Sequence, residues 1–298
     1  MLIRRSTLFV PANIPTFVEK AHTRGADAIC LDLEDSVLPE KKAEARDALA
    51  RAIPSVGRDG ADVLVRINRQ WELAYADLDA AVVPGVTCIV VPKVESPEDI
   101  YAIDRLIEER EVRQDMPRRS VQIAVKLETA RGLLQDVAIA QASPRVCSLS
   151  AGTEDFATDL GVELTEEGWE LFYSRARVVV VARAYGLEPL NLLGRTSDYR
   201  DLHAFRESAL RARRLGFSGA SCIHPSQVPV LNEVFSPTSA EIEGAHRLLE
   251  EAARAEAAAR GAFESGGRMA DAPTVERAKR LLARAARIQQ DGTMSMRA

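Results

Sequence analysis

The chain has 298 residues, of which 46% are hydrophobic, and its 44 acidic and 39 basic side chains leave a formal net charge of −5. This hydrophobic share supports a large core and excludes a disordered chain, while the negative charge argues against nucleic-acid binding, which needs a basic face. No apolar run is long enough to span a bilayer, and the N-terminus leads almost directly into the first predicted strand without a signal-peptide pattern. We therefore expect a cytoplasmic protein that binds neither nucleic acid nor a membrane.

Eight short apolar segments follow one another along the chain, and charged or polar residues accompany their C-terminal ends. Short, nearly continuous apolar runs are typical of parallel strands that are buried on both faces. Helix-patterned stretches separate them, and eight such units predict a TIM (β/α)8 barrel of the α/β class, with its chemistry at the C-terminal ends of the strands. The predicted strands span residues 6–11, 28–35, 63–68, 88–93, 122–128, 146–150, 187–193 and 220–224.

The strand signals stop after the eighth segment, and two helical patterns follow over residues 239–260 and 273–289. A glycine-containing stretch, residues 261–271, joins the two patterns. We therefore predict a barrel over residues 1–235 and a C-terminal helical segment over residues 236–298. The pattern leaves two roles open for this segment: a lid over the barrel mouth or against a neighbouring subunit, and a solvent-facing helical hairpin.

Carboxylates stand at the ends of two adjacent predicted strands, where Glu128 ends the fifth and Glu154-Asp155 end the sixth. Such carboxylates can converge on one cation, and hard oxygen ligands that leave room for water and substrate suit Mg2+. The chain has only four histidines and no HxxH or HExxH spacing, which argues against zinc. From the residues alone, the acids can equally cap helices or pair with Lys93 or Lys126.

Arg66 lies at the C-terminal end of the third predicted strand, where a guanidinium suits a carboxylate or a developing enolate oxygen. The alternative is an ion pair with Asp32, Glu34 or Asp35, which end the neighbouring second strand. We expect these three acids to support a metal site from outside its ligand shell, by orienting the waters of the metal.

The remaining reactive side chains carry weaker signals. His224, at the end of the eighth predicted strand, is either catalytic or a structural residue whose ring bonds a backbone group at the turn. The four cysteines lie in four different predicted strands without CxxC spacing, which favours small buried side chains over a metal or redox role. The chain contains neither the Gly-x-Ser-x-Gly elbow of serine hydrolases nor a dinucleotide-binding GxGxxG after a strand.

Short motifs occur in a fixed order over nearly the whole chain. They lie at residues 5–11, 25–37, 65–68, 92–96, 127–129, 152–156 with 159–161, and 223–228. The ordered set resembles the citrate lyase β-subunit-like family of the HpcH/HpaI aldolase superfamily. Near the C-terminus, residues 267–273 resemble a segment of the malyl-CoA and citramalyl-CoA lyases within that family.

The resemblance implies a TIM barrel that uses Mg2+ to cleave a carbon–carbon bond in a 2-hydroxyacyl thioester. It implies that Glu128 and Asp155 are the metal ligands, that Glu128 also borders the substrate, and that Arg66 contacts the substrate carbonyl. It further implies that Asp271, on the C-terminal lid of a neighbouring subunit, is the acid/base residue of a homo-oligomer, a trimer or hexamer. The expected reaction is a retro-Claisen cleavage of an acyl-CoA thioester of the malyl-CoA, methylmalyl-CoA or citramalyl-CoA type into a 2-oxo acid and a shorter acyl-CoA.

Two departures from the family pattern leave the substrate and other functions open. One is the segment 190–199 at the seventh predicted strand, which differs from the commoner family pattern. The other is Ala220, where many members have lysine, a difference that bears on thioester or nucleotide contacts. The alternatives are a citrate lyase β subunit acting on an acyl-carrier-protein thioester, a malyl-CoA thioesterase, and a non-catalytic barrel that binds a ligand or serves as a scaffold. The lid argues against the first because it obstructs a large carrier, and the complete set Arg66, Glu128, Asp155 and Asp271 argues against the last.

Overall fold

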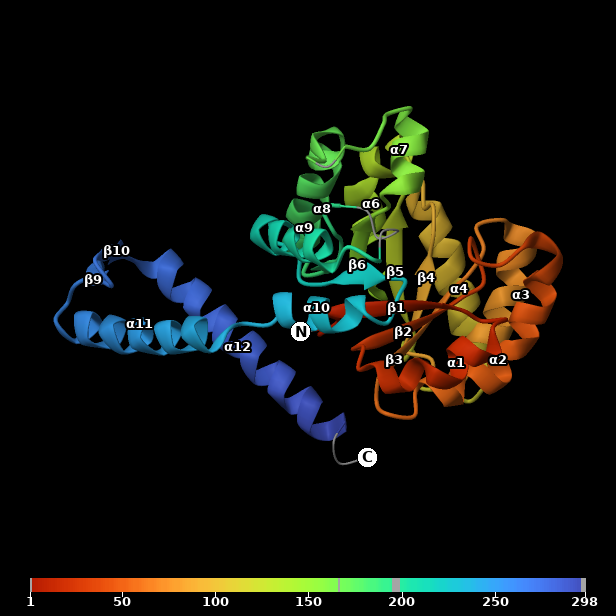
Figure 1. Ribbon diagram of the computed structural model, residues 1–298, viewed down its shortest axis with the longest axis horizontal. Coiled ribbons are helices and arrows are strands. Elements are labelled where there is room, and N and C mark those ends of the chain that lie inside the picture. The colour runs from red at the N-terminus through yellow and green to blue at the C-terminus, as the bar shows by residue number, and fades with distance from the viewer. Residues whose placement is uncertain (1, 166, 195–198, 296–298) are drawn as a thin grey trace. The chain divides into compact units, whose positions relative to one another are not determined.

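A sheet of eight parallel strands forms the centre of the computed structural model, which describes residues 2–165, 167–194 and 199–295 (Figure 1). The strands are hydrogen-bonded in the order β7-β6-β5-β4-β3-β2-β1-β8, and a parallel bridge between Leu190 and Gly219 joins the two ends. The predicted TIM (β/α)8 barrel with a C-terminal helical extension is confirmed. The strands are β1 (Ser6–Pro11), β2 (Ala28–Asp32), β3 (Asp62–Arg66), β4 (Cys88–Val91), β5 (Gln122–Leu127), β6 (Val146–Ala151), β7 (Glu188–Pro189) and β8 (Ala220–Cys222).

Helical segments follow the strands, and local sequence sets where several of them begin. Helix α4 starts at Pro97, behind Ser96, whose hydroxyl accepts a hydrogen bond from the backbone N–H of Asp99 while the Asp99 carboxylate accepts one from the backbone N–H of Ser96. Thr129 caps α5 with a single bond, because its hydroxyl accepts from the backbone N–H of Gly132. The helical segments of the barrel are α1 (Pro15–Ala21), η1 (His22–Arg24), η2 (Pro39–Lys41), α2 (Lys42–Val56), α3 (Trp71–Ala81), α4 (Pro97–Arg113), α5 (Ala130–Leu134), α6 (Asp136–Gln141), α7 (Glu154–Leu160), η3 (Trp169–Leu171), α8 (Phe172–Ala184), α9 (Leu202–Leu215) and α10 (Gln227–Val234).

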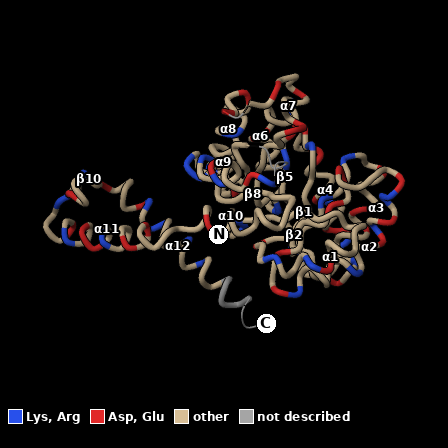
Figure 2. The backbone as a smooth tube through the Cα atoms, in the orientation of Figure 1, with Lys and Arg blue, Asp and Glu red and all other residues tan. Residues whose placement is uncertain are grey.

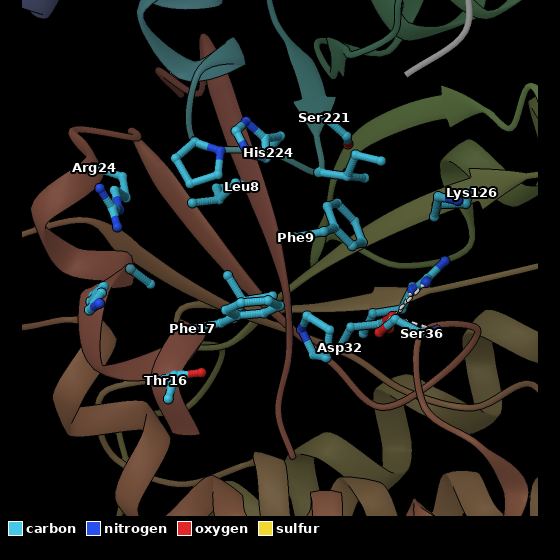
Figure 3. Close-up of a pocket in the computed structure, with 17 residues that line it drawn as sticks. Leu8, Phe9, Thr16, Phe17, Arg24, Asp32, Ser36, Lys126, Ser221 and His224 are labelled. Atoms are coloured by element: carbon cyan, nitrogen blue, oxygen red, sulfur yellow. Dashed lines mark hydrogen bonds and ion pairs between the residues drawn. The ribbon is translucent and has the colours of Figure 1, made fainter. Parts of the chain in front are cut away.

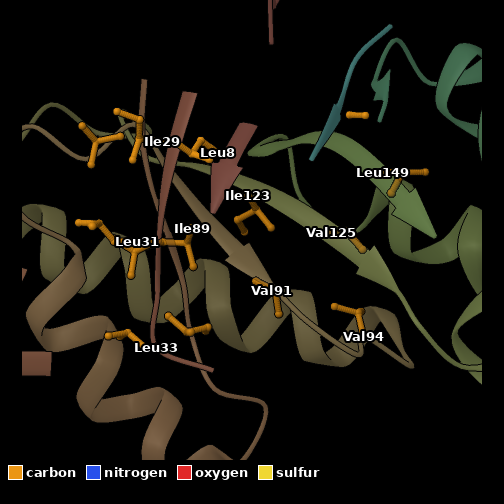
Figure 4. Packing of buried hydrophobic residues seen from close by; sticks show 14 of the residues in the cluster. Leu8, Ile29, Leu31, Leu33, Ile89, Val91, Val94, Ile123, Val125 and Leu149 are labelled. Carbon is orange, nitrogen blue, oxygen red and sulfur yellow. The ribbon is translucent and has the colours of Figure 1, made fainter. Parts of the chain in front are cut away.

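Two separate apolar clusters cover the two faces of the sheet. Alternate strand residues such as Ile29, Leu31, Ile89 and Val91 join the helix side chains in one large buried cluster (Figure 4). The intervening residues form a second cluster inside the barrel, which we call the interior cluster. Its buried members are Ala28, Cys30, Leu64, Cys88, Val90 and Ala124. The strand ends that follow these residues therefore stand over an apolar floor.

All four cysteines are free thiols. Cys30, Cys88 and Cys222 are buried, so the predicted packing role is confirmed for these three, whereas Cys147 is only partly buried. Burial raises the pKa of the Cys222 thiol to about 12, which keeps it protonated and unreactive at neutral pH.

The chain divides into two compact units, Leu2–Phe235 and Ser236–Ala298. The second unit is built on two helices that pack along each other, α11 (Ser239–Ala257) and α12 (Ala272–Ser295). Thr238 starts α11 with a capping box, because its hydroxyl accepts from the N–H of Glu241 while the Glu241 carboxylate accepts from the N–H of Thr238.

A short antiparallel hairpin, β9 (Phe263–Ser265) and β10 (Arg268–Ala270), joins α11 to α12. The prediction that strand signals end with the eighth strand is therefore wrong for this stretch. Gly266 and Gly267 form the turn at φ values of 57° and 74°. A two-residue hairpin turn that needs positive φ at both positions favours Gly-Gly, which is the signal that the helical patterns on either side obscured.

Acidic and basic side chains are interspersed along both units (Figure 2), in keeping with the small net charge of −5. Within the residues that the structure describes, no helix combines the length and the apolar character needed to cross a membrane.

Candidate active site at the carboxyl ends of the strands

A cavity of about 740 Å³ opens beside the carboxyl ends of β1, β2, β3 and β8 (Figure 3). Because parallel strands all end on the same side of a barrel, this is where side chains from distant parts of the chain meet. The lining residues are Leu8, Phe9, Val10, Pro11, Thr16, Phe17, Lys20, Ala21, Arg24, Asp32, Ser36, Arg66, Lys126, Ser221, Ile223, His224 and Pro225.

Arg66 is held in one orientation by a fork-like pair of hydrogen bonds. It ends β3 directly opposite Asp32 at the end of β2, and its Nε and Nη2 donate to Asp32 Oδ1 and Oδ2 at 2.6 and 2.8 Å. Its guanidinium also lies over the Phe9 ring, 5.1 Å from the centroid. Burial by itself raises the pKa of Asp32, but the hydrogen bonds from Arg66 outweigh burial and leave this pKa below its usual value. Arg66 therefore presents a fixed cation to the cavity.

Lys93 connects most of the acids predicted for the site. Its Nζ lies 2.7 Å from Glu34 Oε1, 3.2 Å from Asp35 Oδ1 and 3.3 Å from Asp155 Oδ1, and its backbone N–H donates to Glu128 Oε2 at 2.9 Å. The backbone of Lys93 has φ of 49°, a left-handed conformation that is strained for a residue other than glycine. This central position was missed by the sequence analysis, in which Lys93 was one possible partner of the acids.

Glu128 is almost fully buried, with 1% of its surface exposed. Besides Lys93, it contacts the ammonium of Lys126, which lies two residues earlier and therefore on the same face of the chain. Gly152 packs against it so closely that a Cβ there would lie 2.5 Å from Glu128 Cγ and 2.7 Å from Oε1. The surroundings thus hold the Glu128 carboxylate in place from three directions.

Asp155 does not lie at the end of a strand. The sequence pattern placed Glu154-Asp155 at the tip of the sixth strand, but β6 ends at Ala151 and the two acids open α7. The start of the helix turns them apart, so that Asp155 contacts Lys93 while Glu154 is exposed. Acids in the first turn also suit the positive end of the helix dipole.

The donor set fits a hard divalent cation with few protein ligands. Glu128 and Asp155 both contact Lys93, the first through its backbone N–H and the second through its ammonium, so one residue links the two carboxylates. In the described ranges no group of three or more His, Cys, Asp and Glu side chains gathers for a metal. Two carboxylates completed by water or substrate oxygens are a Mg2+ arrangement rather than a zinc or structural calcium arrangement.

Glu34 lies between Lys93 and Arg66, whose Nη1 is 2.9 Å from Glu34 Oε2. Burial raises the pKa of Glu34 to about 7, against the opposing attraction of these two cations. At pH values between the ordinary pKa of 4.5 and the raised pKa of about 7, Glu34 keeps its proton in the folded state but has released it in the unfolded state.

We expect the free energy of unfolding to fall as pH rises through this window, by an amount of the order of 2 kcal/mol. Urea titrations of the wild type and of Glu34→Gln, at several pH values between about 5 and about 8, measure this effect. The variant should give a flatter profile, and equal slopes in the two proteins would contradict the assignment.

Asp271 lies in the C-terminal unit, between β10 and α12. Its Oδ1 accepts hydrogen bonds from the backbone N–H and hydroxyl of Thr274 at 3.3 and 3.0 Å, so it also caps α12. The barrel unit thus brings Arg66, Glu128 and Asp155 together with the supporting acids, whereas Asp271 belongs to the other unit.

His224 lines the cavity, and its ring bonds a backbone group at the turn, which is the structural one of the two roles that the sequence left open. Its Nδ1 is 2.7 Å from the hydroxyl of Ser226 and accepts from the Ser226 backbone N–H at 3.2 Å, and its ring stacks on Tyr199 with centroids 4.6 Å apart. Ala220 is 1% exposed and belongs to the cluster between sheet and helices, while its neighbour Ser221 lines the cavity. The departure at Ala220 therefore bears on packing rather than on the cavity wall.

Two basic cavity residues were also missed by the sequence analysis. Lys20 and Arg24 line the cavity from α1 and η1, and in Figure 3 Arg24 lies across the cavity from Lys126. Their spacing of four residues, in the helical stretch that follows β1, was the available signal.

Comparison with known proteins agrees with this geometry. The family model described as HpcH/HpaI aldolase/citrate lyase matches residues 5–225. The chain belongs to this family. The citrate lyase subunit β of Haemophilus influenzae is 33% identical over 286 residues, which cover 96% of this chain and 98% of the relative. The L-malyl-CoA/β-methylmalyl-CoA lyase of Rhodobacter capsulatus is 32% identical over 298 residues, with 93% of each chain covered.

Among solved structures, the protein CitE from Mycobacterium tuberculosis in complex with magnesium, acetoacetate and coenzyme A is similar with a TM-score of 0.74. Its sequence is 30% identical, and the alignment covers 94% of this chain and 97% of that one. The similarity therefore includes the C-terminal unit as well as the barrel.

Gly152 offers a way to disturb Glu128 without altering any acid. In Gly152→Ala the new Cβ displaces the Glu128 side chain, and we expect Mg2+ affinity to fall by about tenfold or more, as for other changes next to a metal ligand. Isothermal titration with Mg2+ measures this effect. Gly261→Ala is the control, since its Cβ meets nothing within 4 Å. Unchanged Mg2+ affinity in Gly152→Ala would show that the position of Glu128 is unimportant.

Proposed function

We propose that this protein is a Mg2+-dependent carbon–carbon lyase that cleaves a 2-hydroxyacyl-CoA thioester of the malyl-CoA, methylmalyl-CoA or citramalyl-CoA type into a 2-oxo acid and a shorter acyl-CoA. The observation that carries the proposal is the convergence of Glu128 and Asp155 on Lys93, beside a cavity that Arg66 lines. Membership of the aldolase/citrate lyase family and a relative named as a malyl-CoA lyase support it.

In this proposal Glu128 and Asp155 would hold Mg2+, and Glu128 would also border the substrate. The bound metal supplies Lewis-acid stabilisation of the oxygens at the 2-hydroxy acid end. Arg66 is fixed by Asp32 through its Nε and Nη2, and its Nη1 contacts Glu34 and Asp35. The guanidinium, which lines the cavity, stabilises the thioester enolate that forms when the carbon–carbon bond breaks. Asp32, Glu34 and Asp35 orient Arg66 and the waters around it.

The cavity suits a long thioester arm with a phosphorylated end. Its wall is largely apolar, with Leu8, Phe17 and Ile223, and Lys20 and Arg24 supply positive charge. In Figure 3 Arg24 lies on the opposite side of the cavity from Lys126. We therefore place the acyl end near Arg66 and the phosphates of CoA near Lys20 and Arg24.

Over the whole reaction the 2-hydroxyl loses a proton as the keto group forms, and the enolate carbon gains one. Asp271 is the proposed acid/base residue that exchanges a proton with that carbon. Thr274 occupies only its Oδ1, and Oδ2 has no hydrogen-bond partner in the part of the chain that the structure describes. The neighbouring Met269 is 79% exposed, which is unusual for a large apolar side chain. We propose that residues 236–298 form a lid that carries Asp271 to the barrel of a neighbouring copy, in a homotrimer or hexamer, and excludes water from the enolate.

A panel of thioesters tests the reaction. Purified protein with Mg2+ is mixed with malyl-, methylmalyl- and citramalyl-CoA, and products are identified by mass spectrometry. A Mg2+-dependent 2-oxo acid with a shorter acyl-CoA is the expected result. Free CoA with an intact hydroxy acid would instead identify a thioesterase, and absence of binding to Mg2+ and to every thioester would identify a non-catalytic barrel.

The second candidate is a citrate lyase β subunit that acts on an acyl-carrier-protein thioester. The Haemophilus influenzae relative favours it, since the alignment covers 98% of that protein. Co-purification with acyl carrier protein and turnover of its citryl thioester, with no turnover of CoA esters, is the outcome that would replace the first candidate by the second.

A further inference from the structure

Lys126 places a cation on the inner face of the barrel. Side chains alternate along β5, so Lys126 lies on the same face as Ala124, a member of the interior cluster, and as Glu128 beyond the strand end. It lines the cavity together with Arg66, and in Figure 3 it lies across the cavity from Arg24. The ammonium therefore stands above an apolar floor, in the wall of the cavity and in contact with Glu128.

The protein uses only part of the hydrogen-bonding capacity of Lys126. An ammonium has three N–H donors, and across the described ranges the partner of this one is a single oxygen, Glu128 Oε1. Lys93 differs, because its ammonium contacts three carboxylates. Only 17% of the Lys126 side chain is exposed, and the interior cluster offers no acceptor. The remaining donors therefore need an acceptor within the cavity.

The contact between Lys126 and Glu128 indicates which kind of group this acceptor is. An ammonium on a mostly buried side chain favours an anionic oxygen over a neutral one. In the proposed function, on which this inference rests, Glu128 would hold the metal that takes the 2-hydroxy acid end of the substrate, and Lys126 is the ammonium that contacts Glu128. The phosphates of CoA are assigned to Lys20 and Arg24, which leaves the carboxylate of the 2-hydroxy acid end for Lys126.

We propose that Lys126 binds the carboxylate that becomes the carboxylate of the 2-oxo acid product. The site is thereby specific for thioesters whose cleaved half carries a carboxylate next to the hydroxyl carbon, and it discriminates against those that would release an aldehyde or a neutral ketone. Lys126 acts here by direct contact with substrate, in addition to its ion pair with Glu128.

The test compares a charged and a neutral ligand of the same shape. Pyruvate and pyruvamide are titrated calorimetrically into the Mg2+-saturated full chain, as wild type, Lys126→Met and Lys126→Arg. We expect Lys126→Met to lower the affinity for pyruvate by about tenfold or more, as for the loss of a charged hydrogen bond. The affinity for pyruvamide should fall by less than about twofold. Lys126→Arg, which retains the charge, should recover part of the affinity for pyruvate.

Lys20→Met is the matched control, because it removes another cavity lysine from the side assigned to CoA, and its affinity for pyruvate should equal that of the wild type. Equal weakening of pyruvate and pyruvamide in Lys126→Met would overturn the assignment, as would loss of Mg2+ binding in a separate titration, since Lys126 would then act through Glu128. A wild type that binds neither Mg2+ nor pyruvate would instead overturn the proposed function, and the role of Lys126 with it.

Discussion

Glu128→Gln should abolish turnover, with a fall in rate of about a thousandfold or more and a fall in Mg2+ affinity of at least about a hundredfold, beyond the range seen for residues that only support a metal ligand. The variant keeps the shape of the side chain but removes the negative charge that faces Lys126 and the backbone N–H of Lys93. An amide attracts Mg2+ far less than a carboxylate, and it leaves the Lys126 ammonium without its counter-ion. Calorimetric Mg2+ titration and steady-state turnover of the best thioester measure the two effects.

Glu154→Gln is the control for this experiment. Glu154 lies next to Asp155 in the first turn of α7, but its side chain is exposed. It undergoes the same chemical change one residue away from a proposed ligand, and both Mg2+ affinity and turnover should stay within about twofold of the wild type. Retention of full Mg2+ affinity by Glu128→Gln would refute the assignment of Glu128 as a ligand.

Asp271→Asn should lower turnover by about a hundredfold to ten-thousandfold, the usual contribution of a general acid or base. Mg2+ affinity should not change, because Asp271 belongs to the C-terminal unit and both proposed ligands belong to the barrel. Asparagine caps a helix about as well as aspartate, so α12 and the free energy of unfolding should be preserved. Unfolding curves, Mg2+ titration and turnover on the same preparation separate these effects.

Mixing two inactive variants tests whether Asp271 serves a neighbouring copy. Asp271→Asn retains an intact barrel and Glu128→Gln an intact lid, so co-refolded mixtures should regain a measurable share of wild-type turnover. A mixture of Glu128→Gln and Asp155→Asn should remain inactive, because every barrel in it has lost a ligand. Absence of recovery in the first mixture would place Asp271 in its own chain's site or outside the reaction.

Most of the fold could be predicted from local patterns. Buried parallel strands have a short apolar signature, and seven of the eight segments contain a strand of three or more residues. The seventh is reduced to Glu188–Pro189, with Leu190 in a single bridge to Gly219. A strand at the closure of the ring is set by the fit of the last segments to one another, and proline at its end removes a backbone donor.

The site was predictable in its members but not in its contacts. The expectation that acids gather at the strand ends follows from the parallel direction of the strands. The two interpretations of Arg66, as an ion-pair partner of Asp32 and as a cavity cation, both describe its position, because one side of the guanidinium bonds Asp32 and the residue also lines the cavity. Asp155 lies in α7 and not at a strand tip because β6 ends at Ala151. The end of a strand depends on its pairing with the neighbouring strands, which is not a local property of the sequence.

The sequence by itself determines the strand–helix units, because apolar alternation and helix caps act between near neighbours along the chain. It also determines at which end of the barrel the charged residues lie, because these residues follow the strands in the sequence. The meeting of Asp32, Arg66, Lys93 and Glu128, whose positions lie about thirty residues apart along the chain, depends on the closed sheet. Lys93 contacts four acids from a left-handed backbone position two residues beyond the end of β4. Ion pairs between residues so far apart in the sequence depend on the geometry of the whole sheet, so they cannot be predicted from short-range spacing.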